Sequence, residues 1–159
     1  MKSASLNDLK KELQVLQPKE LIDLCISLAK YKRESKEYLD YLLFESTNKE
    51  LFVSTVKTEI DEHFENLKQQ ENLYYVKKGL RKVLRILSKY SKFLNDKSHS
   101  ADIHIYFCKS LKDSGIPYHK SALIVNLYAQ QLKKINSLVD ALHEDLQQDY
   151  IADLEKLKE

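Results

Sequence analysis

Residues 72–95, NLYYVKKGLRKVLRILSKYSKFLN, show most directly which fold this chain adopts. Apolar residues recur along this stretch every three or four positions, as they do on one face of an α-helix. The stretch contains no acidic residue. We therefore expect a helix from Asn72 to about Leu94, in which Gly79 is a weak point that the helix tolerates.

The basic residues of this expected helix gather on one side. At about 100° per residue, the cations project within an arc of roughly 140°, opposite the apolar residues. Several of the cations stand four residues apart, where like charges destabilise a helix. The cations are Lys77, Lys78, Arg81, Lys82, Arg85, Lys89 and Lys92, and the opposing apolar residues are Val76, Leu80, Val83, Leu84, Leu87, Tyr90 and Leu94.

This basic side has a functional and a structural interpretation. A line of cations matches the phosphate backbone of a nucleic acid, and Tyr74 and Tyr75 beside it could stack on unpaired bases. Alternatively, acidic residues from 59–71 or from 140–155 lie against the helix and neutralise it. Charge runs are usually solvated or paired internally, so the sequence favours the second interpretation.

The composition of the whole chain also favours helices. Its 159 residues include only two glycines and two prolines, whereas sheets and loop-built active sites need turns that are rich in both. Apolar residues make up 43% and charged residues 31%, which is a globular composition that one domain accommodates. We expect an all-α fold with a single helical domain over 1–159, either an antiparallel helical bundle or a short α-superhelical array of about seven helices.

Local signals place the other helices. Residues 103–107 alternate as a strand does, but an isolated strand would leave its backbone unpaired, so we expect a helix that Gly115 ends in the left-handed conformation before Pro117. A helix over Lys49–Lys68 follows a capping box that starts at Thr47, and its core stripe is Phe52, Val53, Val56, Ile60, Phe64 and Leu67. The remaining expected features are a helix after Ser5 capped with Asp8, a helix from Pro18, a break at 32–35, a helix through 38–43, a loop at 95–98, and a last helix from near His119 that is continuous or broken near His143.

The cysteines and the uncharged segments indicate in which compartment of the cell the protein is located. Cys25 and Cys108 sit among apolar neighbours, and we expect both to be free thiols in a reducing compartment. The N-terminus lacks the apolar region of a signal peptide. The longest uncharged run, residues 121–132, is shorter than the roughly 20 residues that a membrane helix requires. We expect a cytoplasmic protein with no membrane association.

Sequence signatures of catalysis and of cofactor binding are absent. The glycines are too few for a phosphate-binding loop, and there is no HExxH, paired CxxC or nucleophile elbow. His104 and Cys108 stand one helical turn apart with His99 nearby, a spacing that metal ligands sometimes have. So few ligand types are a weak signal, and a core thiol beside a surface histidine is the favoured interpretation. We therefore expect no enzyme, no cofactor and no metal.

Five segments of the chain are distinctive: LKKEL at 9–13, LIDLC at 21–25, YLLFE at 41–45, KKGLRKVLR at 77–85 and LHEDLQQDY at 142–150. Together they resemble a bacterial family of small helical proteins of unknown function. The resemblance spans nearly the whole chain and implies a helical, cytoplasmic bacterial protein. It brings no activity and no site residue.

The sequence leaves two hypotheses for function. The leading one is a non-enzymatic helical interaction module that holds a protein partner or self-associates. The alternative is a nucleic-acid-binding protein that uses the basic helix over 72–95.

Overall fold

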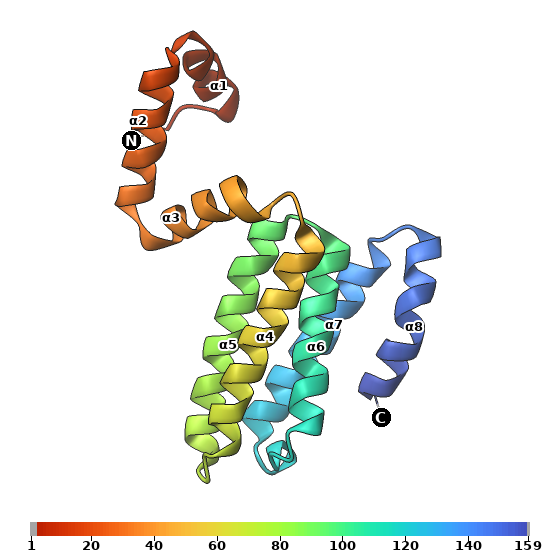
Figure 1. Cartoon of the computed structure of the whole chain (residues 1–159). Helices are drawn as coiled ribbons and strands as arrows, with labels where there is room; N and C mark the ends of the chain where they lie inside the picture. Colours follow the sequence, from red (N-terminus) through yellow and green to blue (C-terminus); the bar gives the residue numbers. More distant parts are fainter. Residues whose placement is uncertain (1–2, 159) are drawn as a thin grey trace. The chain divides into compact units, whose positions relative to one another are not determined.

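The computed structural model describes residues 3–158, which form α-helices and no strand. The predicted all-α class is confirmed. No helix within this range combines the length and the apolar character needed to cross a membrane. The helices are α1 (Leu6–Val15), α2 (Pro18–Tyr31), α3 (Arg33–Asp40), α4 (Lys49–Lys68), α5 (Leu73–Leu94), α6 (Lys97–Asp113), α7 (Ala122–Asp140) and α8 (Glu144–Lys158), with a π-helical turn η1 (Tyr41–Glu45) and a 3₁₀ turn η2 (Tyr118–Lys120) (Figure 1).

The chain divides into two compact units, an N-terminal unit over 1–45 and a C-terminal unit over 46–159. The N-terminal unit contains α1, α2, α3 and η1, and the C-terminal unit contains all the later helices. A single domain over 1–159 stays a prediction.

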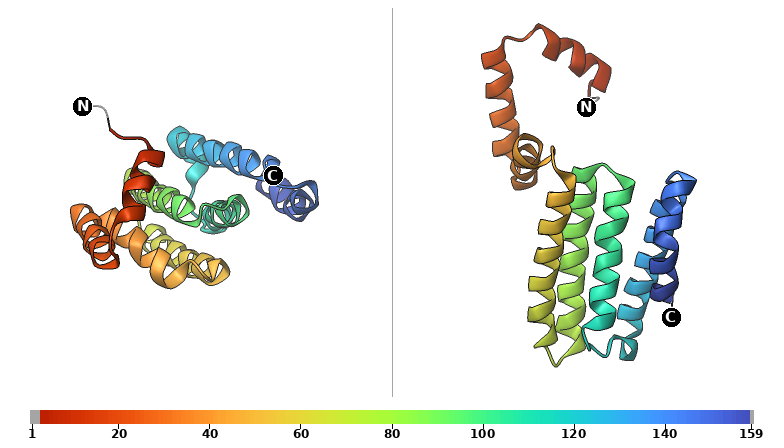
Figure 2. Two further views of the ribbon diagram at one scale, coloured as in Figure 1. Left: turned by 90° about the horizontal axis from the view of Figure 1, so that it is seen from above. Right: turned by 45° about the vertical axis from the view of Figure 1, so that its right-hand side comes forward.

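In the C-terminal unit, α6 is the central helix. It packs against α4, α5, α7 and α8, and the long helices α4 to α7 form an antiparallel array in which α8 lies beyond α6 and α7 (Figure 2). Ile103, Ile105 and Phe107 of α6 are all buried because neighbours cover several sides of this helix. This explains the strand-like alternation of the sequence: a helix surrounded on several sides needs apolar residues around most of its circumference.

Helix α4 has the predicted bounds and the predicted core stripe. Its cap differs from the prediction, because the N-cap residue is Asn48 and not Thr47. The Asn48 Oδ1 accepts a hydrogen bond from the backbone N–H of Leu51 at 3.0 Å. Asn and Thr both cap helices, so the sequence motif alone does not distinguish the two positions.

Other helix boundaries are partly as expected. Ser5 and Asp8 form the predicted capping box of α1, Pro18 is the first residue of α2, and Gly115 has a φ of 73° after α6. The break at 32–35 and the loop at 95–98 are shorter than predicted, because α3 begins at Arg33 and α6 begins at Lys97. The last predicted helix is not continuous: it is broken near His143 into α7 and α8, which was one of the two predicted alternatives. Helix α7 begins at Ala122, later than the predicted start near His119.

Gly79 is more than a tolerated weak point, which corrects the prediction. A Cβ atom placed on Gly79 would overlap the side chain of Leu67, a core residue of α4. The glycine therefore allows α4 and α5 to approach closely at this point.

Replacing Gly79 with alanine should destabilise the protein, although alanine is the better helix former by about 1 kcal/mol. We expect a net loss of about 1 kcal/mol in the free energy of unfolding, because overpacking a core costs roughly 1–3 kcal/mol. Urea unfolding measures this change. In a Leu67→Ala background the same substitution should become neutral or stabilising, and a stabilising effect in the wild-type background would contradict the close approach.

Candidate functional site

The predicted cations all lie on α5, which is one uninterrupted helix from Leu73 to Leu94. Lys77 and Lys89 are half-buried and the other five are exposed. We call the seven residues the basic face of α5: Lys77, Lys78, Arg81, Lys82, Arg85, Lys89 and Lys92.

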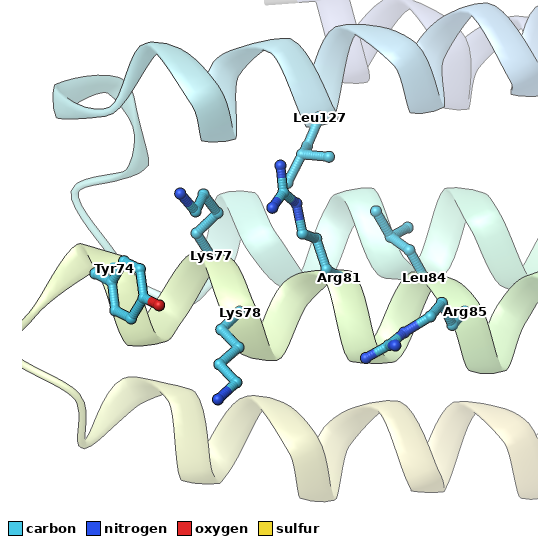
Figure 3. A pocket seen from close by; sticks show the side chains of 7 residues that line it. All are labelled: Tyr74, Lys77, Lys78, Arg81, Leu84, Arg85 and Leu127. Atoms are coloured by element: carbon cyan, nitrogen blue, oxygen red, sulfur yellow. The ribbon is translucent and has the colours of Figure 1, made fainter.

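A groove of about 530 Å³ runs along the basic face, between α5 and α7. Figure 3 shows Lys77 and Arg81 extending toward α7, where Arg81 ends beside Leu127, and Lys78 extending the other way. Both helices pack on α6, which holds the two sides of the groove in place. The residues that line it are Tyr74, Lys77, Lys78, Arg81, Leu84 and Arg85 of α5 and Leu127 of α7.

Leu84 corrects one detail of the sequence prediction. The sequence assigns it to the apolar side, with Val76, Leu80 and Val83, which are fully buried. In the structure Leu84 is only half-buried and lines the groove with the cations. At about 100° per residue it projects roughly 20° from Lys77, so it borders the basic face.

Most of the basic face is not neutralised by ion pairs. Within residues 3–158, no acidic side chain forms an ion pair with any of six of its cations. The ammonium of Lys89 lies over the ring of Tyr90, at 4.8 Å from its centroid. The six cations without an ion pair are Lys77, Lys78, Arg81, Lys82, Arg85 and Lys92.

The acidic residues that the sequence offered as partners are used elsewhere. In α4, Glu59 accepts a hydrogen bond from Tyr90 at 2.8 Å, and Asp61 accepts one from Tyr106 at 2.8 Å. The acidic helix α8 packs on α6 and α7, away from α5 (Figures 1 and 2), where Asp153 pairs with Lys109 at 2.6 Å. Glu59 thus contacts α5 through Tyr90, but neither it nor Asp61 or Asp153 forms an ion pair with the six cations.

Helix α7 adds no negative charge to the groove over most of its length. Residues 122–139 contain no Asp or Glu. Burial lowers the pKa of the half-buried Lys134 on α7, and the positive charge of Lys92 lowers it further. Lys92 adds positive charge near the C-terminal end of α5.

Two tyrosines stand at the start of the basic face. Tyr74 is 59% exposed and Tyr75 is 54% exposed, and their rings meet edge to face at 5.3 Å between centroids. Tyr74 lines the groove, and the Lys77 ammonium lies 5.4 Å from the centroid of its ring. Exposed aromatic rings beside cations are the usual stacking surface for unpaired bases.

His104 corrects a second sequence prediction, because it is buried and not at the surface. Its Nδ1 donates a hydrogen bond to Oε1 of Gln131 on α7 at 2.9 Å, and its Nε2 lies 3.2 Å from Oγ of Ser91 on α5. Burial, and secondly the charge of Lys134, lower the pKa of His104 to about 4. This chain of hydrogen bonds ties α5, α6 and α7 together.

The Ser91–His104–Gln131 chain has the connectivity of a catalytic triad without its chemistry. A serine triad uses a carboxylate to stabilise the protonated imidazole, whereas Gln131 is neutral and both burial and Lys134 oppose protonation of His104. His104 is also only 1% exposed, so a substrate has no access to it. We therefore assign these hydrogen bonds a structural role.

The thiols and imidazoles do not gather into a metal site. Both ring nitrogens of His104 already have partners, and burial raises the pKa of the Cys108 thiol to about 12. In the part of the chain that the structure describes, no group of three or more His, Cys, Asp or Glu residues could hold a metal ion. Cys25 and Cys108 are free thiols, and Cys25 is exposed.

Comparison with protein-family models, with curated proteins and with solved structures found no match. The resemblance to a bacterial family therefore stays a prediction.

The sequence did not predict that α7 contributes residues to this site. Leu127, Gln131 and Lys134 reach α5 and α6 only through tertiary packing. One signal was available, because the acid-free run over 122–139 is visible in the sequence and matches the acid-free run of α5.

The buried imidazole should make stability depend on pH. The pKa of His104 is about 4 in the folded chain and near its ordinary value of 6.5 in the unfolded chain, so the unfolded chain binds a proton first as pH falls. The neutral His104 therefore contributes to the free energy of unfolding. This contribution is fully present above pH 6.5 and is lost as pH falls to about 4, by about 3 kcal/mol in total. Urea unfolding across this range should show a shallower pH dependence for His104→Gln. Loss of the exposed His143 in His143→Gln should leave the dependence nearly unchanged.

Charge reversal at Arg81 should stabilise the fold. The residue repels Lys77 and Arg85 at four residues' distance, and Arg81→Glu makes both pairs attractive. We expect a gain of about 1 kcal/mol in the free energy of unfolding at low salt, which shrinks at high salt. Arg81→Gln should gain about half as much. A loss of stability in both variants would show that the Arg81 side chain stabilises the fold by packing.

Proposed function

We propose that this chain binds single-stranded nucleic acid along the basic face of α5. The observation that carries the proposal is the set of six cations without an ion pair, on one side of one helix, next to an acid-free side of α7. Phosphates would supply the counter-charges that the described residues do not provide to these six cations as ion pairs.

The arrangement of the cations favours a polymer over a small anion. Helix α5 has 22 residues and is therefore about 33 Å long, and its cations run from Lys77 to Lys92. A small phosphorylated ligand needs donors that converge on one point. A line of separate cations suits a ligand whose charge is also spread along a line.

The tyrosines and the groove favour a single strand over a duplex. An unpaired strand is flexible enough to follow the groove between α5 and α7, and it exposes base faces that can stack on Tyr74. Leu84 and Leu127 offer apolar surface in the same groove. In a duplex the base faces are already stacked on one another, so Tyr74, Leu84 and Leu127 would make few contacts with them.

The stability cost of the basic face supports a functional role. Like charges four residues apart destabilise α5, and six of its seven cations have no ion pair with an acid of the described residues. Proteins keep such local conflicts mainly at functional sites. The proposal needs no catalytic group, and it fits the cytoplasmic location that the sequence predicts.

Binding should be salt-dependent and should require the central arginines. If each of the six cations without an ion pair meets one phosphate, the log of the association constant should fall with the log of salt concentration with a slope of about −4 for a single strand. Arg81→Glu combined with Arg85→Glu should abolish binding while the free energy of unfolding stays equal or rises. Fluorescence anisotropy with a labelled mixed-sequence oligonucleotide measures the binding.

The matched control is Lys156→Glu combined with Lys158→Glu, which changes the net charge equally on α8. This variant should bind almost as the wild type does. Tyr74→Ala should weaken single-strand binding by roughly five- to 150-fold, because a stacked base is worth about 1–3 kcal/mol. Binding that is absent, insensitive to salt, or weaker than binding to anionic lipid vesicles would contradict the proposal.

A further inference from the structure

The N-terminal unit has almost no core of its own. Among residues 3–45, Tyr41 is the only buried residue, whereas the C-terminal unit has buried residues on every helix from α4 to α8. Isolated helices of this length are marginal in water without tertiary packing. The N-terminal unit therefore needs a further apolar surface against it.

Helix α2 has an apolar surface wider than one neighbour covers. At about 100° per residue, its apolar residues span roughly 220° of the circumference. Helix α3 packs against α2. Ile22, Ile26 and Leu28 nevertheless stay exposed, at 62%, 45% and 57%. A helix with such a wide apolar arc is typical of the inside of a bundle.

An apolar groove lies between α2 and α3. It has a volume of about 270 Å³, and Cys25, Leu28, Ala29 and Leu39 are among the residues that line it. The same unit also carries an amphipathic helix with an exposed apolar stripe. Helix α1 presents Leu6, Leu9 and Leu13 on one stripe, and all three are exposed.

The exposed apolar area is large enough for a stable dimer. Thirteen of the twenty exposed large hydrophobic side chains of the described residues belong to this short unit. At roughly 150–250 Å² for a fully exposed aromatic and somewhat less for a leucine, they amount to an area on the order of 1,000 Å². The largest apolar patch of a monomer is usually about 300–600 Å², and a standard interface buries about 800 Å² per partner.

The charges of the unit suit pairing with a second copy. Residues 3–45 contain seven basic and eight acidic residues, so two copies of this surface have little net charge with which to repel each other. A two-fold dimer also uses each feature twice, because the helix of one copy meets the groove of the other and the reverse. A foreign partner would have to match both features separately.

We propose that the N-terminal unit is a homodimerisation module, in which α1 of each copy packs its leucine stripe into the α2–α3 groove of the other copy. This inference is independent of the nucleic-acid proposal, since it concerns other residues and another unit. A dimer would carry two basic faces, which would raise the avidity for a long strand.

Light scattering of the full chain over a range of concentrations tests the dimer. The wild type should have twice the chain mass of 18.7 kDa and should dissociate on dilution. Leu9→Glu and Leu28→Glu should each give the mass of one chain, with the helix content by circular dichroism retained because the C-terminal unit keeps its core. The matched control is Ser27→Glu, which adds the same charge on the polar side of α2 and should remain dimeric.

Thiol alkylation tests which surfaces meet. Cys25 lies in the groove and is exposed, and Cys108 is buried and serves as the internal control. In the dimer, Cys25 should react slowly, and it should react many-fold faster after dilution or in Leu9→Glu, although Leu9 is on a different helix. A wild type that is monomeric at all concentrations, a dimer that survives both substitutions, or a Cys25 rate that is the same in wild type and Leu9→Glu would each overturn the proposal.

Discussion

The burial of α6 among four other helices is the constraint on which the C-terminal unit depends. Because α4, α5, α7 and α8 all pack on it, α6 has apolar residues around most of its circumference, and its one buried histidine must stay neutral. The same packing places α5 and α7 on the two sides of one groove and connects them through Ser91, His104 and Gln131. The packing of α5 and α7 on α6 thus determines where the candidate site lies.

Packing around α6 also gives several acidic residues partners other than the six cations of the basic face that have no ion pair. The acids of α4 receive hydrogen bonds from Tyr90 and Tyr106, and α8 pairs its Asp153 with Lys109 of α6. A groove of about 480 Å³ between α4 and α6 is lined by Asp61, Glu65 and Asp113 together with Lys68 and Lys109. Six cations of α5 have no ion pair among the described residues, so their mutual repulsion is not relieved in this way. This is the physical basis for expecting an anionic ligand.

The two units differ in how far their apolar side chains are buried. The C-terminal unit buries its apolar stripes within one chain, as the fully covered Val76, Leu80 and Leu87 of α5 illustrate. The N-terminal unit has equally regular stripes on α1 and α2 and leaves them exposed. A short helical unit with an apolar groove and an exposed leucine stripe has the features of an association module, and the line of cations on α5 has the features of a polymer-binding site. The two roles fit one protein that binds a long ligand through more than one copy.

The sequence by itself determined the helices, the core stripe of α4 and the single basic side of α5, because these depend on residues three or four positions apart. It also marked Gly115 and Pro18, whose backbone preferences are local. Only the tertiary structure decided that Gly79 lies against Leu67, that His104 is buried, that Glu59 bonds to Tyr90 and that Asp153 pairs with Lys109. Each of these depends on which distant segments pack together, and helical periodicity specifies the apolar face of a helix without specifying its neighbour.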